Sequence, residues 1–126
     1  MKPGAGKTPF VKSFKYAIQG VIEAYRTGFN IRVQTAGAVL VIVLGFVFSL
    51  APWEWCAVLI CCGLVIGGEC VNSAIEDAVD LASPELHPVA KAAKDMAAGA
   101  VYIFAFTSAI VGCIVFIPHV LSLLGW

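Results

Sequence analysis

The sequence predicts an all-α integral membrane protein, in which one amphipathic surface helix precedes three transmembrane helices. Of the 126 residues, 60% are hydrophobic and only 13% are charged, whereas soluble domains have about 45–50% apolar and about 25% charged residues. Lysine and arginine together number 8, as do aspartate and glutamate, so the formal net charge is zero. This balance excludes a nucleic-acid-binding protein driven by bulk positive charge. It also excludes a disordered chain, which combines low hydrophobicity with high net charge.

The N-terminal region predicts a helix over residues 10–28 that lies on the membrane surface. Apolar side chains recur there at steps of three and four residues, and charged side chains occupy the other face. The apolar positions are Phe10, Phe14, Ala17, Ile18, Val21 and Tyr25. Such a helix lies along the inner leaflet with its basic residues near anionic headgroups. The alternative is a helix packed on another cytoplasmic protein. Residues 1–9 are expected to form a flexible leader.

Three hydrophobic segments are long enough to cross a bilayer. A helix rises 1.5 Å per residue and the hydrocarbon core is about 30 Å thick, so about 20 residues suffice. We expect the spans at residues 31–52, 53–82 and 89–117, within a single domain over residues 1–126. The third span is expected to stop before Pro118, which lacks the N–H that a continuing helix needs. The acidic end of the second span should reach the interface or project beyond it.

The basic residues predict the orientation of these spans. Every lysine and arginine either precedes the first span or lies between the second and the third; they are Lys2, Lys7, Lys12, Lys15, Arg26, Arg32, Lys91 and Lys94. The positive-inside rule places that side in the cytoplasm. The N-terminus is therefore expected inside and the C-terminus outside.

Polar residues form a stripe along the second half of the second span. At 100° per residue, five of them fall within about 100° of one helix face: Glu69, Asn72, Ser73, Glu76 and Asp80. We call these five residues the acidic stripe. Carboxylates at membrane depth cost about 2.5–3.5 kcal/mol each on insertion scales, so several on one face indicate a functional site. The alternative is that they are structural partners of Lys91, Lys94 or Arg32.

The segment after the stripe supplies positive charge. Pro84 and Pro88 interrupt the helix, and Lys94 and Asp95 stand at the cytoplasmic mouth of the third span. Carboxylates beside a lysine suit magnesium–nucleotide chemistry, because Mg²⁺ binds one or two carboxylates plus phosphate oxygens and a lysine steadies a transferring phosphate. A different function class stays open on the residues alone. In it, an oligomeric channel or proton-conducting subunit lines its pore with these carboxylates.

Residues 69–80 resemble the signature of the small prokaryotic diacylglycerol kinase and undecaprenol kinase family. That signature reads E-x-aliphatic-N-S/T-A-aliphatic-E-x-x-aliphatic-D, and this sequence matches it throughout. Residues 87–88 and 93–101 are similar to a second block of the family, and the resemblance covers residues 14–118. The stretches 87–91 and 97–101 look more like undecaprenol kinases than diacylglycerol kinases.

The resemblance implies a homotrimeric lipid kinase in the bacterial inner membrane, with its active site on the cytoplasmic side. Such enzymes use ATP and Mg²⁺ to phosphorylate the hydroxyl of undecaprenol or diacylglycerol, giving undecaprenyl phosphate or phosphatidate. No nucleic-acid partner is implied.

The resemblance also implies roles for individual residues. Glu69 would be the catalytic base near the lipid hydroxyl. Glu76 would ligate the magnesium of ATP, and Lys94 would contact the γ-phosphate. Three residues would complete the catalytic site: Asn72, Asp80 and Asp95. Three more would lie near the nucleotide: Tyr16, Glu85 and His87.

One position departs from the family pattern. Gly28, four residues before Arg32, stands where the family usually carries a glutamate that helps to bind metal. Either another ligand replaces that acid, or metal affinity is weaker; the candidate replacements are Glu23, Asp77, Glu85 and water. We expect Gly28→Glu to lower the magnesium concentration needed for activity.

Overall fold

The computed structural model describes residues 9–126, and within this range the chain forms four helices and no β-strand. The helices are α1 (Phe10–Thr27), α2 (Phe29–Val47), α3 (Pro52–Ala82) and α4 (Pro88–Leu123). The predicted all-α class is confirmed. Residues 1–8 of the expected leader lie outside the described residues.

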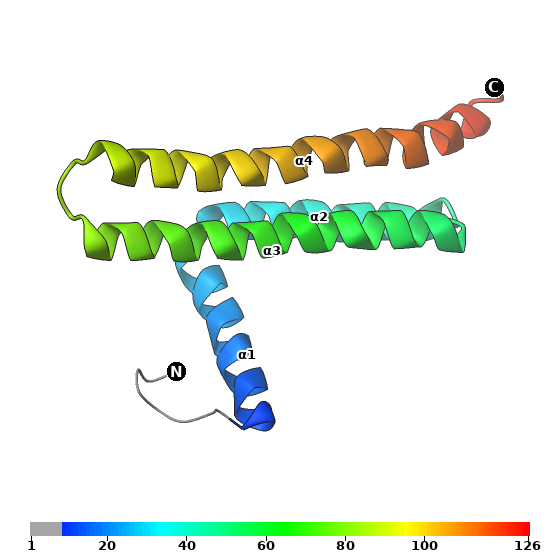
Figure 1. Ribbon diagram of the computed structural model, residues 1–126. Helices are drawn as coiled ribbons and strands as arrows, with labels where there is room; N and C mark the ends of the chain where they lie inside the picture. The colour runs from blue at the N-terminus through cyan, green and yellow to red at the C-terminus, as the bar shows by residue number, and fades with distance from the viewer. Residues whose placement is uncertain (1–8) are drawn as a thin grey trace.

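Three long helices form the body of the molecule. α3 runs antiparallel to α4 along nearly its whole length, α2 lies against α3, and α1 projects steeply away from them (Figure 1). Within residues 9–126, α2 and α4 both pack on α3 but make no close backbone contact with each other. The side of α3 between α2 and α4 is therefore lined by three helices.

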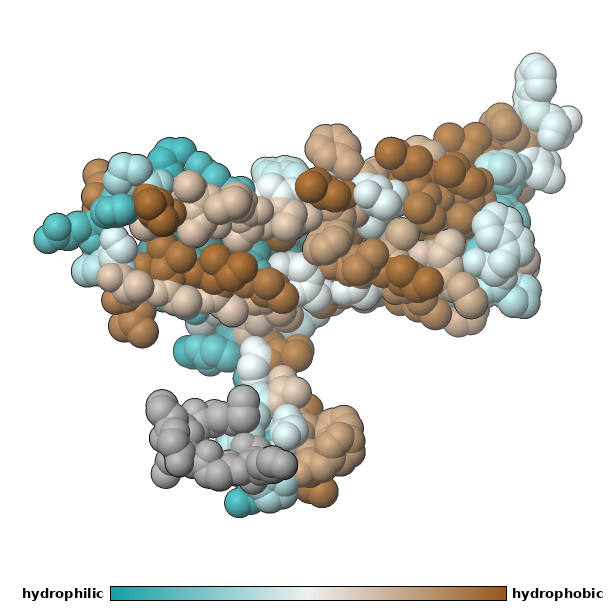
Figure 2. Space-filling model, viewed as in Figure 1, coloured by the Kyte–Doolittle hydropathy of each residue, from teal (hydrophilic) through white to brown (hydrophobic). Residues whose placement is uncertain are grey.

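α2, α3 and α4 are each long and apolar enough to cross a membrane, with 19, 31 and 36 residues. Large apolar side chains are exposed along them, for example Leu40, Ile60 and Phe106. Figure 2 shows this hydrophobic surface over the long helices and the hydrophilic residues gathered at the end where α3 joins α4. A surface of this kind is stable in lipid rather than in water. The structure thus has three candidate membrane spans, as expected.

The end of the bundle that contains the turn from α2 to α3, which we call the outer end, differs from expectation in two places. α2 ends at Val47 rather than near residue 52, and the chain turns through Ser49, whose φ of 51° is left-handed. α4 continues through Pro118 to Leu123, so the prediction that the third span ends at residue 117 is wrong. Proline removes a single helical hydrogen bond, and long membrane helices tolerate this loss.

The added turn of α4 closes the outer end of the bundle. It brings His119 Nε2 to 2.8 Å from Oε2 of Glu54 on α3, and the His119 ring packs beside Phe48. The other carboxylate oxygen of Glu54 accepts a hydrogen bond from the Ala51 N–H at 3.0 Å. Glu54 is buried, with 7% of its surface exposed. A buried carboxylate requires such partners.

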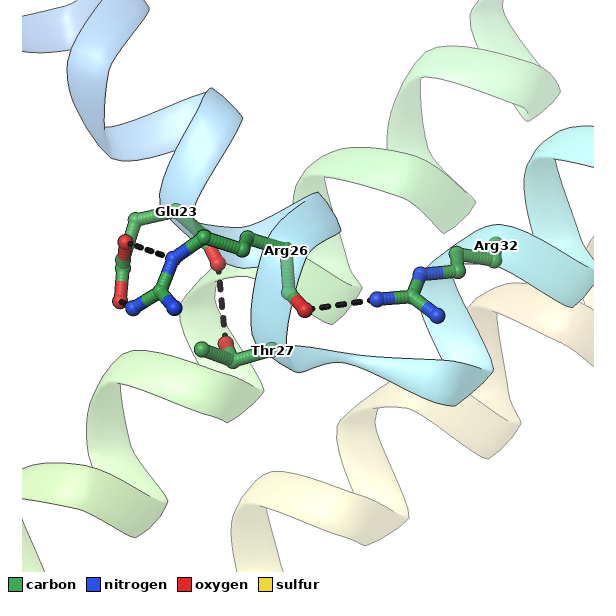
Figure 3. A network of polar contacts seen from close by, with 4 residues as sticks. All are labelled: Glu23, Arg26, Thr27 and Arg32. Atoms are coloured by element: carbon green, nitrogen blue, oxygen red, sulfur yellow. Dashed lines mark hydrogen bonds and ion pairs between the residues drawn. The ribbon is translucent and has the colours of Figure 1, made fainter.

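The opposite end of α2 is tied to α1 by Arg32. Its guanidinium donates to the carbonyl oxygens of Tyr25 and Arg26, at 2.7 and 2.6 Å. These carbonyls belong to the last turn of α1, where helical acceptors have no partner within the helix. Figure 3 shows the contact to Arg26, whose own side chain pairs with Glu23 at 2.6 Å. Arg32 therefore fixes the direction in which α1 leaves the bundle.

Candidate active site

Three residues of the acidic stripe face the space between α2 and α4. Glu69 and Asn72 are buried, with 4% and 8% of their surface exposed, and Glu76 is half-buried one turn further along α3. They line a pocket of about 260 Å³, which we call the polar pocket. Its walls are Asn30, Gln34, Glu69, Asn72, Glu76, Ala98, Val101, Tyr102 and Ala105. All three long helices contribute to it.

The hydrogen bonding in the polar pocket leaves two acceptors for a ligand. Asn72 Nδ2 donates to Glu76 Oε1 at 3.1 Å, which orients the Glu76 carboxylate. Asn72 Oδ1 is buried and has no partner among the described residues. The Glu69 side chain likewise makes no hydrogen bond within residues 9–126. Because buried polar groups in proteins are nearly always hydrogen-bonded, these atoms are suited to a substrate hydroxyl.

A second, charged pocket of about 230 Å³ lies where α3 ends and α4 begins. Its charged and polar walls are Asp80, Ser83, Glu85, His87, Lys91, Lys94 and Asp95. Lys94 Nζ lies 2.5 Å from Asp80 Oδ1, and Lys91 Nζ lies 2.6 Å from Asp95 Oδ2. This pocket combines two ammonium groups with three carboxylates and opens to solvent, so each lysine must exchange its aspartate partner for a phosphate oxygen if an anion binds here.

Local sequence explains the position of the charged pocket. His87 caps α4, because its Nδ1 accepts a hydrogen bond from the Val89 N–H at 3.1 Å. Pro88 then occupies the first helical position, where its missing N–H costs nothing. Lys91 and Lys94 follow in the first two turns of α4 and so return toward the end of α3.

The structure places all but one of the predicted site residues in one or the other of the two pockets. Glu69, Asn72 and Glu76 lie in the polar pocket, and Asp80, one helical turn beyond Glu76, begins the charged pocket. The charged pocket also holds Glu85, His87, Lys94 and Asp95. Tyr16, on α1, lines neither pocket.

Gly28 joins α1 to α2 in a crowded position. A Cβ atom there would lie 2.8 Å from the Ala24 carbonyl oxygen and 3.1 Å from Ile31 Cγ2. A glutamate at this position therefore requires a shift of the backbone. Glu23, one of the expected replacements, is engaged by Arg26.

The residues present fit a magnesium ion only when phosphate oxygens complete its shell. No group of three or more histidine, cysteine, aspartate or glutamate side chains within residues 9–126 is arranged to hold a metal. Mg²⁺ in phosphoryl-transfer sites typically has one or two carboxylate ligands, with water and substrate phosphates as the others. Glu76, which faces the polar pocket next to the charged one, is suited to be such a carboxylate.

Sequence reasoning missed the contribution of α2 and α4 to the polar pocket. Asn30 and Gln34 line it from α2, and Tyr102 lines it from α4. Asn30 and Gln34 are four residues apart, so they share one face of α2, whose other residues are apolar except for Arg32 and Thr35. Paired amides in a membrane span are a recognisable signal of a site.

Comparison with known proteins decides the family. A sequence model of the family described as prokaryotic diacylglycerol kinase matches residues 15–116. The chain belongs to this family. The prokaryotic diacylglycerol kinase family consists of lipid kinases, so membership favours a kinase over the channel that the acidic stripe alone left open.

Several members are similar over most of their length. An undecaprenol kinase of Bacillus subtilis is 43% identical over 109 residues, which are 86% of this chain and 89% of that protein. A diacylglycerol kinase of Synechocystis is 37% identical over an alignment of 135 positions, covering 98% of this chain and 77% of that protein. A diacylglycerol kinase of Pseudomonas aeruginosa is 33% identical over 88 residues, with 70% and 72% covered.

Proposed function

We propose that this protein transfers the γ-phosphate of ATP to the hydroxyl of a membrane lipid. The acceptor is undecaprenol or diacylglycerol, and the product is undecaprenyl phosphate or phosphatidate. One observation carries the proposal: a buried carboxylate, Glu69, faces a polar pocket within a membrane span, and this pocket is followed along α3 by the charged pocket. Asp80, the first residue of the charged pocket along α3, lies about 16 Å beyond Glu69 along the helix axis.

In this proposal Glu69 is the general base. Its carboxylate accepts the proton of the lipid hydroxyl while the hydroxyl oxygen forms a bond to the γ-phosphorus. The bond from that phosphorus to the β,γ-bridging oxygen breaks, and ADP leaves. The burial of Glu69 supports this role, because a hydroxyl that enters from the hydrocarbon region meets no competing water.

The remaining residues position the nucleotide. The Lys94 ammonium group exchanges Asp80 for the γ-phosphate. Before the nucleotide binds, Asp80 positions Lys94 and Asp95 positions Lys91. Asn72 orients Glu76 through the bond at 3.1 Å, and Glu76 would hold Mg²⁺. When bound, the metal neutralises charge on the β- and γ-phosphates.

The charge distribution supports a cytoplasmic active site in the bacterial inner membrane. Arg26, Arg32, Lys91 and Lys94 all lie at the end of the bundle that carries the charged pocket, and the outer turn around Glu54 has no lysine or arginine. Such an asymmetry retains the basic end in the cytoplasm, where ATP is available. The proposal includes a homotrimer because the kinases that residues 69–80 resemble are homotrimers.

Phosphate transfer in a reconstituted system tests the function. The full chain in lipid vesicles would receive labelled ATP and Mg²⁺, with undecaprenol and diacylglycerol offered in parallel. The control is the same sample with its Mg²⁺ removed by a chelator. We expect Mg²⁺-dependent label in at least one lipid. Absence of label in both lipids, together with ion flux through the vesicles, would overturn the kinase and favour the channel.

A further inference from the structure

Tyr25, near the end of α1, contacts α2 through two different groups. Its hydroxyl lies 2.5 Å from Thr35 Oγ1, and its carbonyl oxygen accepts the hydrogen bond from the Arg32 guanidinium at 2.7 Å. Thr35 Oγ1 donates its single hydrogen to the Ile31 carbonyl oxygen at 2.7 Å. The Tyr25 hydroxyl is therefore the donor to Thr35, since a threonine hydroxyl has one hydrogen and two acceptor sites. We call this hydrogen bond from Tyr25 to Thr35 the clasp.

The clasp lies beside a junction with little conformational freedom. Gly28 alone joins α1 to α2 (Figure 3), and its N–H donates to the Ala24 carbonyl oxygen at 2.9 Å. Ile31 is only 1% exposed, and its Cγ2 would lie 3.1 Å from a Cβ added at Gly28. Ile31 and Thr35 are four residues apart, so they form one row along the side of α2 that meets α1. The contacts of this row with α1 therefore help to fix the rotation of α2 about its own axis.

The neighbouring row of α2 lines the polar pocket. Asn30 and Gln34 each precede a member of the first row by one residue, which is about 100° around the helix. Both side chains line the polar pocket together with Glu69. A rotation of α2 that breaks the clasp therefore also moves these two amides relative to the Glu69 carboxylate.

We propose that Tyr25 is a positioning residue for the lipid acceptor. Through Thr35 it holds the Asn30 and Gln34 amides at the wall of the polar pocket, where they orient the acceptor hydroxyl toward Glu69. This inference rests on the proposed lipid kinase function and deepens it. The clasp should leave the nucleotide unaffected, because the described residues that line the charged pocket all belong to α3, α4 or the loop between them.

Substitutions at both ends of the clasp test this role. Tyr25→Phe and Thr35→Val each remove the hydrogen bond and keep the approximate size of the side chain, whereas Thr35→Ser retains the hydroxyl. Thr27→Val is the matched control. Thr27 is the last residue of α1, it lines neither pocket, and its hydroxyl donates within α1, to the Glu23 carbonyl oxygen at 2.9 Å.

Phosphate transfer by the full chain in lipid vesicles should be measured with ATP and Mg²⁺, and with undecaprenol and dioleoylglycerol as separate acceptors. We expect Tyr25→Phe and Thr35→Val to lower kcat/KM for the lipid about three- to tenfold, which is the range for one hydrogen bond. The KM for ATP should not change. Thr35→Ser and Thr27→Val should resemble the unmodified protein. In Gln34→Leu, which already lacks one of the positioned amides, the further effect of Tyr25→Phe should be smaller.

Four results would overturn the positioning role. They are an unchanged kcat/KM for the lipid in both Tyr25→Phe and Thr35→Val, an equal change in the KM for ATP, a loss in Thr35→Ser as large as in Thr35→Val, and strict additivity of Tyr25→Phe with Gln34→Leu. The second result would show a general loss of structure instead.

Failure of the kinase proposal is distinguishable from failure of the clasp. In that case the unmodified protein would label neither lipid, and the acceptor role of Tyr25 would fall with it. Hydrogen exchange of the backbone amides around Gly28 tests the clasp without any substrate. It should be faster in Tyr25→Phe than in Thr27→Val, and equal exchange in these two variants would contradict the clasp itself.

Discussion

Lys94 Nζ on α4 lies 2.5 Å from Asp80 Oδ1 on α3, and this ion pair joins the end of the acidic stripe to the start of the third span. Both side chains are substantially exposed, at 40% and 61%. Exposed ion pairs contribute about 0–1 kcal/mol to stability. The position of the pair in the charged pocket therefore indicates a role in binding rather than in holding the fold.

Replacement of Lys94 by methionine should separate these two roles. We expect kcat for phosphate transfer to fall by about 10²–10³-fold, as for the loss of one preorganised charge at a reacting centre. The thermal midpoint should stay nearly constant because the pair is exposed. Lys12→Met is the control for charge, since Lys12 is exposed on α1 and lines neither pocket. A K94M variant with normal turnover would remove Lys94 from the mechanism.

Replacement of Arg32 by alanine should loosen α1. The substitution removes two hydrogen bonds from a charged donor to the last turn of α1. Each hydrogen bond stabilises the folded state by at most about 3 kcal/mol. We expect faster hydrogen exchange of the α1 amides, measured by mass spectrometry. Lys12→Ala, an exposed position on α1, should leave exchange unchanged. Equal exchange in both variants would contradict the capping role of Arg32.

The Glu23–Arg26 pair should make the end of α1 sensitive to acid. The hydrogen bond from the Arg26 guanidinium lowers the pKa of Glu23 below its ordinary value of 4.5. The folded helix therefore gains stability from the pair above about pH 4.5. This gain is lost as the pH falls through the lowered pKa of Glu23 in the folded helix. Amide protection in the last turn of α1 should decrease over that window. The same profile in Glu23→Gln would show that the pair is not responsible.

Loss of the Glu54–His119 contact should destabilise the outer end of the bundle. His119→Ala removes the partner of a buried carboxylate oxygen, which costs about 1–3 kcal/mol. The thermal midpoint should fall, while the KM for ATP should stay constant because the charged pocket lies at the opposite end. In Glu54→Gln the further effect of His119→Ala should be smaller, as a double-mutant cycle would show. Strict additivity would exclude a direct interaction.

Features that depend on one segment of the chain were predictable from the sequence. The lengths of the apolar runs gave three spans, and the helical periodicity of residues 69–80 placed Glu69, Asn72 and Glu76 on one face, as the structure confirms. The predicted end of the third span before Pro118 was wrong. Proline ends most helices, but near the end of a 36-residue membrane helix the loss of one hydrogen bond is tolerated.

Features that depend on two segments needed the fold. Glu54 and His119 are 65 residues apart, and no periodicity connects them. Asn30 and Gln34 complete the polar pocket only because α2 packs on the same side of α3 as the acidic stripe. The crowding at Gly28 depends on the junction of α1 and α2, so the expected benefit of Gly28→Glu for magnesium now has to offset a strained backbone.

Turnover of Glu69→Gln shows whether Glu69 is the general base. The substitution keeps the size of the side chain and removes its ability to accept a proton. Phosphate transfer to the lipid and binding of ATP with Mg²⁺ should be measured on the same preparation. We predict that transfer falls by at least about 10²-fold, as for loss of a general base, while ATP binding stays within a factor of about two because Glu69 lies outside the charged pocket. Near-normal transfer by Glu69→Gln would contradict the assignment of Glu69 as the base.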